Sequence, residues 1–499
     1  MITALSRIPF IQTLPYLFVF LASLYRPWDS DLGWHLKYGE YFFRDFSILR
    51  ENIYSTEMVG FVWPNTNWLT DVITYAIFSA SGFFGLSLAA ALIVTLTFWA
   101  FSKAFDLDFY QKAIIYPLLV ILESPIHFVS FRGQLLSILF LGILFYFLEK
   151  LSERRKLVFI PLLFVVWVNT HGQFILGLGI FGLYLGFKII EQIIREDVKP
   201  STVAVLEALR TCKILIISFI LAVFAGVINP FGVATYQIAL SHFNSEELKY
   251  IMEYLPIEDL TEDWWRLMFY GVMLFFGLLA FIFTGKVKEN ISRVGIVSIF
   301  YALAFMVRRY AWSMYYLGIP LLKPVANFLK PDSEKNAVRA GIVMFVFYIG
   351  FTLYLKQPFD QYYRMNWQVY CSEYTMCSDK AIEYVRDNNL SENMMSMYNW
   401  GGYMIWRYPE VKPSIDGRMT VWKDPENGYS PLSVYYAYEQ GWEDIEFSKF
   451  DTVLMGNDKQ VYNRLNELVE EGRWEKRFED EYGGVFTRVK ESTQSAEFE

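Results

Sequence analysis

The sequence is poor in charge, cysteine and histidine. Charged residues make up 19% of the 499 residues, hydrophobic residues make up 54%, and the chain has three Cys and four His. So few cysteines exclude a disulfide-rich scaffold, and the abundance of large apolar residues excludes a disordered chain. The net charge of −8 leaves no general basic surface, so we expect no nucleic acid among the partners.

The sequence contains several long apolar runs. They lie at 83–101, 135–147, 214–228 and 338–355, and such lengths approach or cross roughly 30 Å of hydrocarbon. We therefore expect an all-α membrane domain with about eleven transmembrane helices. The expected spans are 10–25, 72–101, 112–124, 133–149, 157–170, 173–194, 213–229, 266–284, 293–307, 311–328 and 338–356.

Basic residues gather in alternate loops between these spans. They lie at Arg7, 150–156, 188–213, 286–293 and 330–339. Because short loops rich in Lys and Arg stay in the cytoplasm, this pattern predicts a multi-pass protein of the cytoplasmic (inner) membrane with a cytoplasmic N-terminus. The first loop, 26–71, and everything after residue 356 then lie on the outer face.

The composition changes after residue 356. Residues 357–499 mix charged, aromatic and turn residues and contain no apolar run of span length. We expect an extracytoplasmic soluble α/β domain there, following a transmembrane domain at 1–356 that includes the first outer loop, 26–71. Helices are expected at 380–388 and 459–473, and strands at 452–455 and 484–489. Cys371 and Cys377 would face an oxidising compartment, where a disulfide and two free thiols are equally compatible with the sequence.

Candidate chemistry lies at the start of the first outer loop. Asp29, Asp31 and His35 follow directly on the first span, and carboxylates at that depth are costly unless they face water, a cation or each other. They could accept a proton from an attacking hydroxyl or bind a divalent metal; the alternative is a helix cap. Residues 33–46 read as an amphipathic helix in the membrane interface, with a second helical start at 63–71.

The same loop resembles part of a known group of proteins. It carries Asp29-Ser-Asp-Leu-Gly-Trp-His-Leu36, Tyr38-Gly-Glu40, Arg50-Glu-Asn-Ile-Tyr-Ser55 and Asn67-Trp-Leu-Thr-Asp71. Further motifs follow in order at Phe131-Arg-Gly-Gln-Leu135, Trp167-Val-Asn-Thr-His-Gly172, Asn229-Pro-Phe-Gly232, Arg308-Arg309, Tyr398-Asn-Trp-Gly-Gly-Tyr403 and Ile415-Asp-Gly-Arg418. The ordered set is similar to a large group of bacterial and archaeal multispanning proteins related to the GT-C glycosyltransferases.

That resemblance implies a GT-C-like membrane fold, a polyprenyl-phosphate-linked sugar donor and a catalytic carboxylate at the start of the first outer loop. By position the carboxylate is Asp31 or Asp29, which the sequence does not separate. Asn52 and Asn67 stand where the group often has acids, and Gly33 replaces an aromatic residue. These departures put a multi-carboxylate metal site in doubt, although Asp71 is a possible second acid, and a cation such as Mg²⁺ or Mn²⁺ held by Asp29 and Asp31 stays open.

Several residues suit substrate binding on the outer side. Arg offers a planar fork that phosphate oxygens accept well, and Arg132, Arg308 and Arg309 fall at outer ends of expected spans. The alternatives for the arginine pair are interfacial snorkelling and a reversed topology. His35 and His171 also fall at outer ends, although His171 could simply terminate its helix. The turns expected at 399–403 and 416–418 could present groups to a sugar, or be ordinary turns.

We therefore predict a membrane glycosyltransferase, of inverting GT-C type, that transfers a sugar from a polyprenyl-phosphate donor to a glycan, lipid or protein acceptor. One alternative is a transporter or flippase of a lipid-linked or small polar substrate. Such proteins usually carry ionisable residues near the midplane and often have duplicated halves, whereas this sequence has few charges at midspan and no visible halves. The other is a non-catalytic membrane scaffold whose outer domain binds a partner. Membrane lipids are expected partners in each case.

Overall fold

The structure of the protein is a computed structural model that describes residues 9–128, 131–195, 202–257, 261–357 and 365–489. The chain is mostly helical and divides into two compact units. Unit 1 consists of residues 1–27, 64–70 and 77–363, and unit 2 consists of 28–63, 71–76 and 364–499. Arg7, which the expected orientation used, lies outside the described residues.

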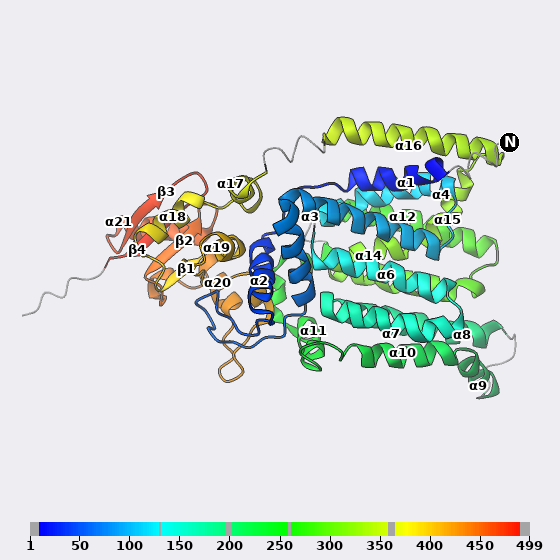
Figure 1. The fold of residues 1–499 in the computed structure, drawn as a ribbon, viewed down its shortest axis with the longest axis horizontal. Helices are drawn as coiled ribbons and strands as arrows, with labels where there is room; N and C mark the ends of the chain where they lie inside the picture. Colours follow the sequence, from blue (N-terminus) through cyan, green and yellow to red (C-terminus); the bar gives the residue numbers. More distant parts are fainter. Residues whose placement is uncertain (1–8, 129–130, 196–201, 258–260, 358–364, 490–499) are drawn as a thin grey trace, which may run out of the picture. The chain divides into compact units, whose positions relative to one another are not determined.

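Unit 1 is a set of helices that run side by side (Figure 1). Six helices among the described residues are long and apolar enough to cross a membrane. They are α3 (Trp68–Ala104), α6 (Gly133–Lys150), α8 (Phe174–Arg195), α12 (Thr261–Phe283), α13 (Ile291–Met306) and α16 (Glu334–Lys356). A bent pair, α9 (Thr202–Thr211) and α10 (Lys213–Ala225), makes seven if it forms one span.

The remaining helices of unit 1 are shorter. They are α1 (Pro9–Ala22), α4 (Phe109–Leu122), α5 (Ser124–Phe128), α7 (Glu153–Thr170), α11 (Ala234–Asn244), α14 (Arg309–Leu317) and α15 (Ile319–Phe328), with 3₁₀ turns η2 (Glu246–Tyr250), η3 (Met252–Tyr254) and η5 (Lys288–Asn290). A helix covers part or all of each expected span, but the count of eleven crossings is not confirmed. The span expected at 311–328 is two helices, because α14 ends at Gly318 and Pro320 lies in the first turn of α15.

Unit 2 contains a four-stranded sheet in the order β1-β2-β4-β3. β1 (Met394–Ser396) pairs parallel with β2 (Thr452–Gly456), and β4 (Gly483–Arg488) pairs antiparallel with both β2 and β3 (Trp474–Glu479). The strand β2 is apolar without interruption over Val453–Met455, as expected for a strand that is buried on both faces of its sheet. The helices are α2 (Leu32–Asp45), α17 (Trp367–Val369), α18 (Asp379–Asp387), α19 (Gly401–Arg407), α20 (Pro431–Glu439) and α21 (Gln460–Glu470), with helical turns η6 (Tyr370–Thr375), η7 (Tyr398–Trp400), η8 (Gly417–Val421) and η9 (Ile445–Phe447).

Several local predictions for unit 2 are confirmed. The helix expected at 33–46 is α2, the helices expected at 380–388 and 459–473 are α18 and α21, and the two expected strands are β2 and β4. The turn expected at 399–403 is wrong, because η7 and the start of α19 make it helical. The helix expected to reach 473 ends at Glu470, and the segment continues into β3, which the sequence analysis did not predict.

Most of the first outer loop, residues 28–63, belongs to unit 2 together with the C-terminal residues, although we expected the loop to group with 1–356. α2 lies against α19 at two glycines, since a Cβ on Gly33 would overlap the carbonyl oxygen of Gly402. This close approach leaves no space for an aromatic side chain at position 33. Trp28, at the start of the loop, donates to the carbonyl of Tyr374, which lies between the disulfide-bonded Cys371 and Cys377.

Candidate active site

Asp29 forms the turn that leads into α2. Its carboxylate Oδ1 accepts a hydrogen bond from the backbone N–H of Asp31 at 3.1 Å, and its carbonyl accepts one from the N–H of Leu32 at 3.0 Å. The hydroxyl of Tyr370 donates to the same carbonyl. Asp29 is 3% exposed, so this residue shapes the backbone and has little access to a substrate.

Asp31 occupies the N-cap position of α2 but does not act as a cap. Its carboxylate accepts no hydrogen bond from the first turn of the helix, which is what a capping Asp would do. The side chain is half-buried and stands over Gly417, where a Cβ would overlap Oδ1. The capping role that competed with a chemical one therefore does not account for this carboxylate.

His35 lies one turn further along α2 and pairs with Asp71. Nδ1 of the imidazole is 2.5 Å from Oδ1 of Asp71, and both side chains are buried. Burial opposes protonation, but the carboxylates of Asp71, Asp29 and Asp31 together raise the pKa of His35 above its ordinary value. Three nearby carboxylates thus favour the protonated form of His35, and Asp71 is the one in hydrogen-bonding contact with it.

A second buried network adjoins Asp31 through Gly417. Arg418 donates from Nε and Nη2 to the two carboxylate oxygens of Asp416 at 2.6 Å each, and both side chains are fully buried. Despite the cost of burial, the guanidinium holds the pKa of Asp416 below its usual range. Arg418 further donates to Tyr38, Asn52 and Ser55.

Asn52 has a structural role in this network. Its Oδ1 accepts from Arg418 at 3.1 Å, and its Nδ2 donates to the carbonyl of Glu57 at 2.8 Å. An acid at this position would lose the bond that Nδ2 donates. The asparagine at this position thus has a hydrogen-bonding role that an acid could fill only in part.

The three arginines expected to bind phosphate lie in unit 1 and pair with acids. Arg132 and Arg309 each place Nη1 3.2 Å from Glu253, and Arg308 lies 2.5 Å from Asp263. Arg309 also donates to the hydroxyl of Tyr254 at 2.6 Å. Each of the three arginines is therefore held in an ion pair.

Positive charge exceeds negative charge among the described side chains of this group. Burial raises the pKa of Glu253, but Arg132, Arg309 and Arg308 hold it below its ordinary value. Arg266 shares Asp263 with Arg308, at 2.6 Å. Four guanidinium groups thus share two described carboxylates, although the side chains of Glu258, Asp259 and Glu262 lie outside the described residues.

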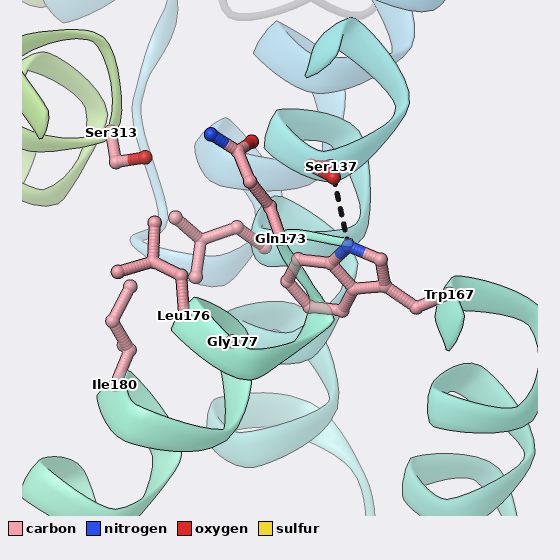
Figure 2. A pocket seen from close by; sticks show the side chains of 8 residues that line it. Ser137, Trp167, Gln173, Leu176, Gly177, Ile180 and Ser313 are labelled. Carbon is pink, nitrogen blue, oxygen red and sulfur yellow. Dashed lines mark hydrogen bonds between the residues drawn. The ribbon is translucent and has the colours of Figure 1, made fainter. Parts of the chain in front are cut away.

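His171 ends α7 and is held by Ser137. Its Nδ1 lies 2.8 Å from Oγ of Ser137, which also accepts a hydrogen bond from Nε1 of Trp167 at 2.9 Å. Figure 2 shows the latter bond at the wall of a small cavity. About 180 Å³ of empty space, open solvent included, is lined by Ser137, Leu141, Trp167, Gln173, Leu176, Gly177, Ile180 and Ser313. This is below the roughly 300 Å³ of ordinary ligand pockets.

The predicted site residues thus fall into three groups. Asp29, Asp31, His35 and Asp71 come together in unit 2, Arg132, Arg308 and Arg309 come together in unit 1, and His171 stands with Ser137 in unit 1. Within the part of the chain that the structure describes, no three His, Cys, Asp or Glu side chains gather as metal ligands.

Sequence reasoning missed the partners that organise these groups. Glu253 bridges two of the arginines, and Ser137 holds His171. Glu253 carried one signal, because it lies in an acidic stretch, 246–263, between the spans expected at 213–229 and 266–284. Ser137 carried none, since a single serine in an apolar helix is common.

Comparisons with known proteins add no family. The sequence matches no protein-family model and has no significant match among curated proteins.

Proposed function

We propose that this protein is a membrane glycosyltransferase that moves a sugar from a polyprenyl-phosphate-linked donor to an acceptor hydroxyl. The apolar helices support membrane association. The ordered motifs that resemble GT-C relatives support the reaction class. The observation that carries the proposal is the group formed by Asp31, Asp29, His35 and Asp71, in which Asp31 has a carboxylate that does not cap its own helix.

We assign the general base to Asp31. Asp29 is almost fully buried and accepts the N–H of Asp31, whereas Asp31 is half-buried and accessible. In the proposed step, Asp31 takes the proton of the acceptor hydroxyl, and the acceptor oxygen attacks the anomeric carbon. The bond from that carbon to the phosphate oxygen breaks, and polyprenyl phosphate leaves with the electron pair, with inversion.

The arginine group of unit 1 is assigned to phosphate recognition. Arg132, Arg308 and Arg309 offer planar donors, and within the described residues four guanidinium groups gather around Glu253 and Asp263. A dianionic phosphate would share these donors with Glu253 and Asp263, and charge-assisted bonds of this kind are among the stronger hydrogen bonds. His171 and Asp71 have no assigned contact with the transferred group.

We infer an outer-face location for residues 28–63 and 364–499. The Cys371–Cys377 disulfide supports it, because disulfides persist in oxidising compartments. The basic loops between the apolar segments support the same orientation. The acceptor, whether glycan, lipid or protein, would then be met outside the cytoplasm.

The test begins with the lipids that purify with the protein. The wild type and Asp31→Asn are isolated in mild detergent, their lipids are extracted, and mass spectrometry is used to search for polyprenyl phosphate and its sugar-loaded form. Asp387→Asn, an exposed carboxylate elsewhere in unit 2, serves as the matched control. We expect the carrier in all three samples, with the sugar-loaded form enriched only in Asp31→Asn.

Two results would contradict the proposal. If no such lipid accompanies folded protein, a transporter of another substrate or a scaffold becomes the better reading. If the carrier is present but Asp31→Asn transfers sugar as fast as the wild type, the assignment of the base is wrong.

A further inference from the structure

The Asp416–Arg418 pair has no part in the proposed chemistry, although it belongs to a motif that stands out in the sequence. Both side chains are 0% exposed. A buried ion pair is weak support for stability, because desolvation offsets much of the attraction. The pair therefore calls for another explanation, which its geometry provides.

The guanidinium of Arg418 links three segments of unit 2. It reaches the hydroxyl of Tyr38 on α2 at 2.7 Å, Oγ of Ser55 in the first outer loop at 2.6 Å, and Asp416 just before η8. Ser55 in turn donates to Asp416. The planar fork of Arg fixes all of these directions at once, which a flexible ammonium cannot do.

One end of this network meets Asp31 at Gly417, and the other end, Tyr38, lies on the same helix as Asp31. Asp31, His35 and Tyr38 are spaced four and three residues apart, so they lie along one face of α2. Gly417, between the two members of the pair, is where the Asp31 carboxylate rests. The pair thus fixes α2 through Tyr38. It also fixes the Gly417 backbone next to the Asp31 carboxylate.

We propose that Asp416 and Arg418 are positioning residues for Asp31: the buried pair fixes the Gly417 backbone against the Asp31 carboxylate and so sets the orientation of that carboxylate. The catalytic consequence depends on the proposed function, but the positioning itself does not. Only glycine at 417 allows the two groups to meet.

The decisive variant is Gly417→Ala. It places a methyl group where the Asp31 carboxylate stands and leaves the charges of Asp416, Arg418 and Asp31 in place. Gly350→Ala is the matched control, because a Cβ there meets no atom within 4 Å. The full-length protein is used throughout.

The first readout needs no catalysis. The chain has four histidines, so histidine labelled with ¹³C gives few NMR signals, and His35→Gln identifies that of His35. Asp71, Asp29 and Asp31 all raise the pKa of His35. We expect Gly417→Ala to lower the titration midpoint of His35, Gly350→Ala to leave it unchanged, and Gly417→Ala to have no further effect in an Asp31→Ala background.

The second readout is transfer activity. Misplacing a base by about 1 Å can cost on the order of 100-fold in rate, so we expect Gly417→Ala to lower kcat by about that factor with KM little changed. Arg418→Lys, which keeps the charge and loses the fork, should lower kcat in the same direction and also lower the His35 midpoint. Should Gly417→Ala fail to fold, Arg418→Lys carries the test.

The outcomes separate the two proposals. If the His35 midpoint does not move, or moves equally with and without Asp31, the positioning role is wrong. If the midpoint behaves as expected but the wild type transfers no sugar, the positioning role holds and the glycosyltransferase proposal fails.

Discussion

His35 and Asp71 are 36 residues apart in the sequence, yet Nδ1 of the imidazole and Oδ1 of the carboxylate are 2.5 Å apart in the buried part of unit 2. The pair joins the first helix after the acidic turn to the start of α3. Its protonation state therefore affects the segment that carries Asp31.

Stability should depend on pH through His35. Its folded pKa is raised above its unfolded value of about 6.5, so the stabilisation is fully present below pH about 6.5 and is lost as pH rises through the folded pKa. Thermal unfolding of the wild type should show this decline and His35→Gln should not. His242→Gln is the control, because burial lowers the pKa of His242 and its contribution has the opposite sign. An unchanged pH profile in His35→Gln would refute the ion pair.

Asp71→Asn should be destabilising. It removes the closest counter-charge of a buried imidazolium, and breaking one side of a buried pair typically costs about 3–5 kcal/mol. The measurement is denaturant unfolding in mild detergent, with Asp387→Asn as the exposed control. Equal stabilities of Asp71→Asn and the control would mean that His35 is neutral in the folded protein.

The disulfide should hold the acidic turn. Replacing Cys371 and Cys377 by Ser opens a short loop, and its closure contributes about 2 kcal/mol in the chain-entropy account. The hydroxyl of Tyr370 and the carbonyl of Tyr374 contact Asp29 and Trp28. We expect faster hydrogen exchange at 28–32 as well as at 370–377. Faster exchange confined to 370–377 would show that the turn is held by other contacts.

Glu253→Gln should strengthen phosphate binding. The carboxylate competes with any bound phosphate for Arg132 and Arg309, so its neutralisation leaves both cations more available. The affinity for a short prenyl phosphate, measured by thermophoresis, should rise in Glu253→Gln and fall in Arg309→Gln. An affinity that falls in both variants would mean that Glu253 positions the arginines for the ligand instead of competing with it.

Local sequence patterns predicted the elements of unit 2 more accurately than they predicted the number of membrane spans. The amphipathic repeat of α2 and the apolar runs of β2 and β4 depend on neighbours in the sequence, and these elements begin and end close to where we expected. The count of eleven crossings required every apolar segment to be a full span. The structure does not confirm that count, and the break at Gly318 shows that a run of apolar residues does not reveal where a helix stops.

The candidate site was predictable in its residues but not in its partners. Asp29, Asp31 and His35 are close in sequence, so their meeting follows from the chain itself. The contacts of Arg418 with Tyr38, Asn52 and Ser55 join residues 363 to 380 positions apart. No local rule could indicate that a motif read as a turn would be a buried ion pair.

Unit 2 is built from segments that lie far apart in the sequence, and this affects how it folds during synthesis. Its first segment, 28–63, emerges from the ribosome roughly 300 residues before its main partner, 364–499. Synthesis proceeds from the N-terminus. The face of α2 that packs against α19 therefore stays uncovered until every intervening helix has been translated. Residues 364–499 thus complete the fold of unit 2. A chain truncated before them would lack the surroundings of Asp31, even if its membrane helices had inserted correctly.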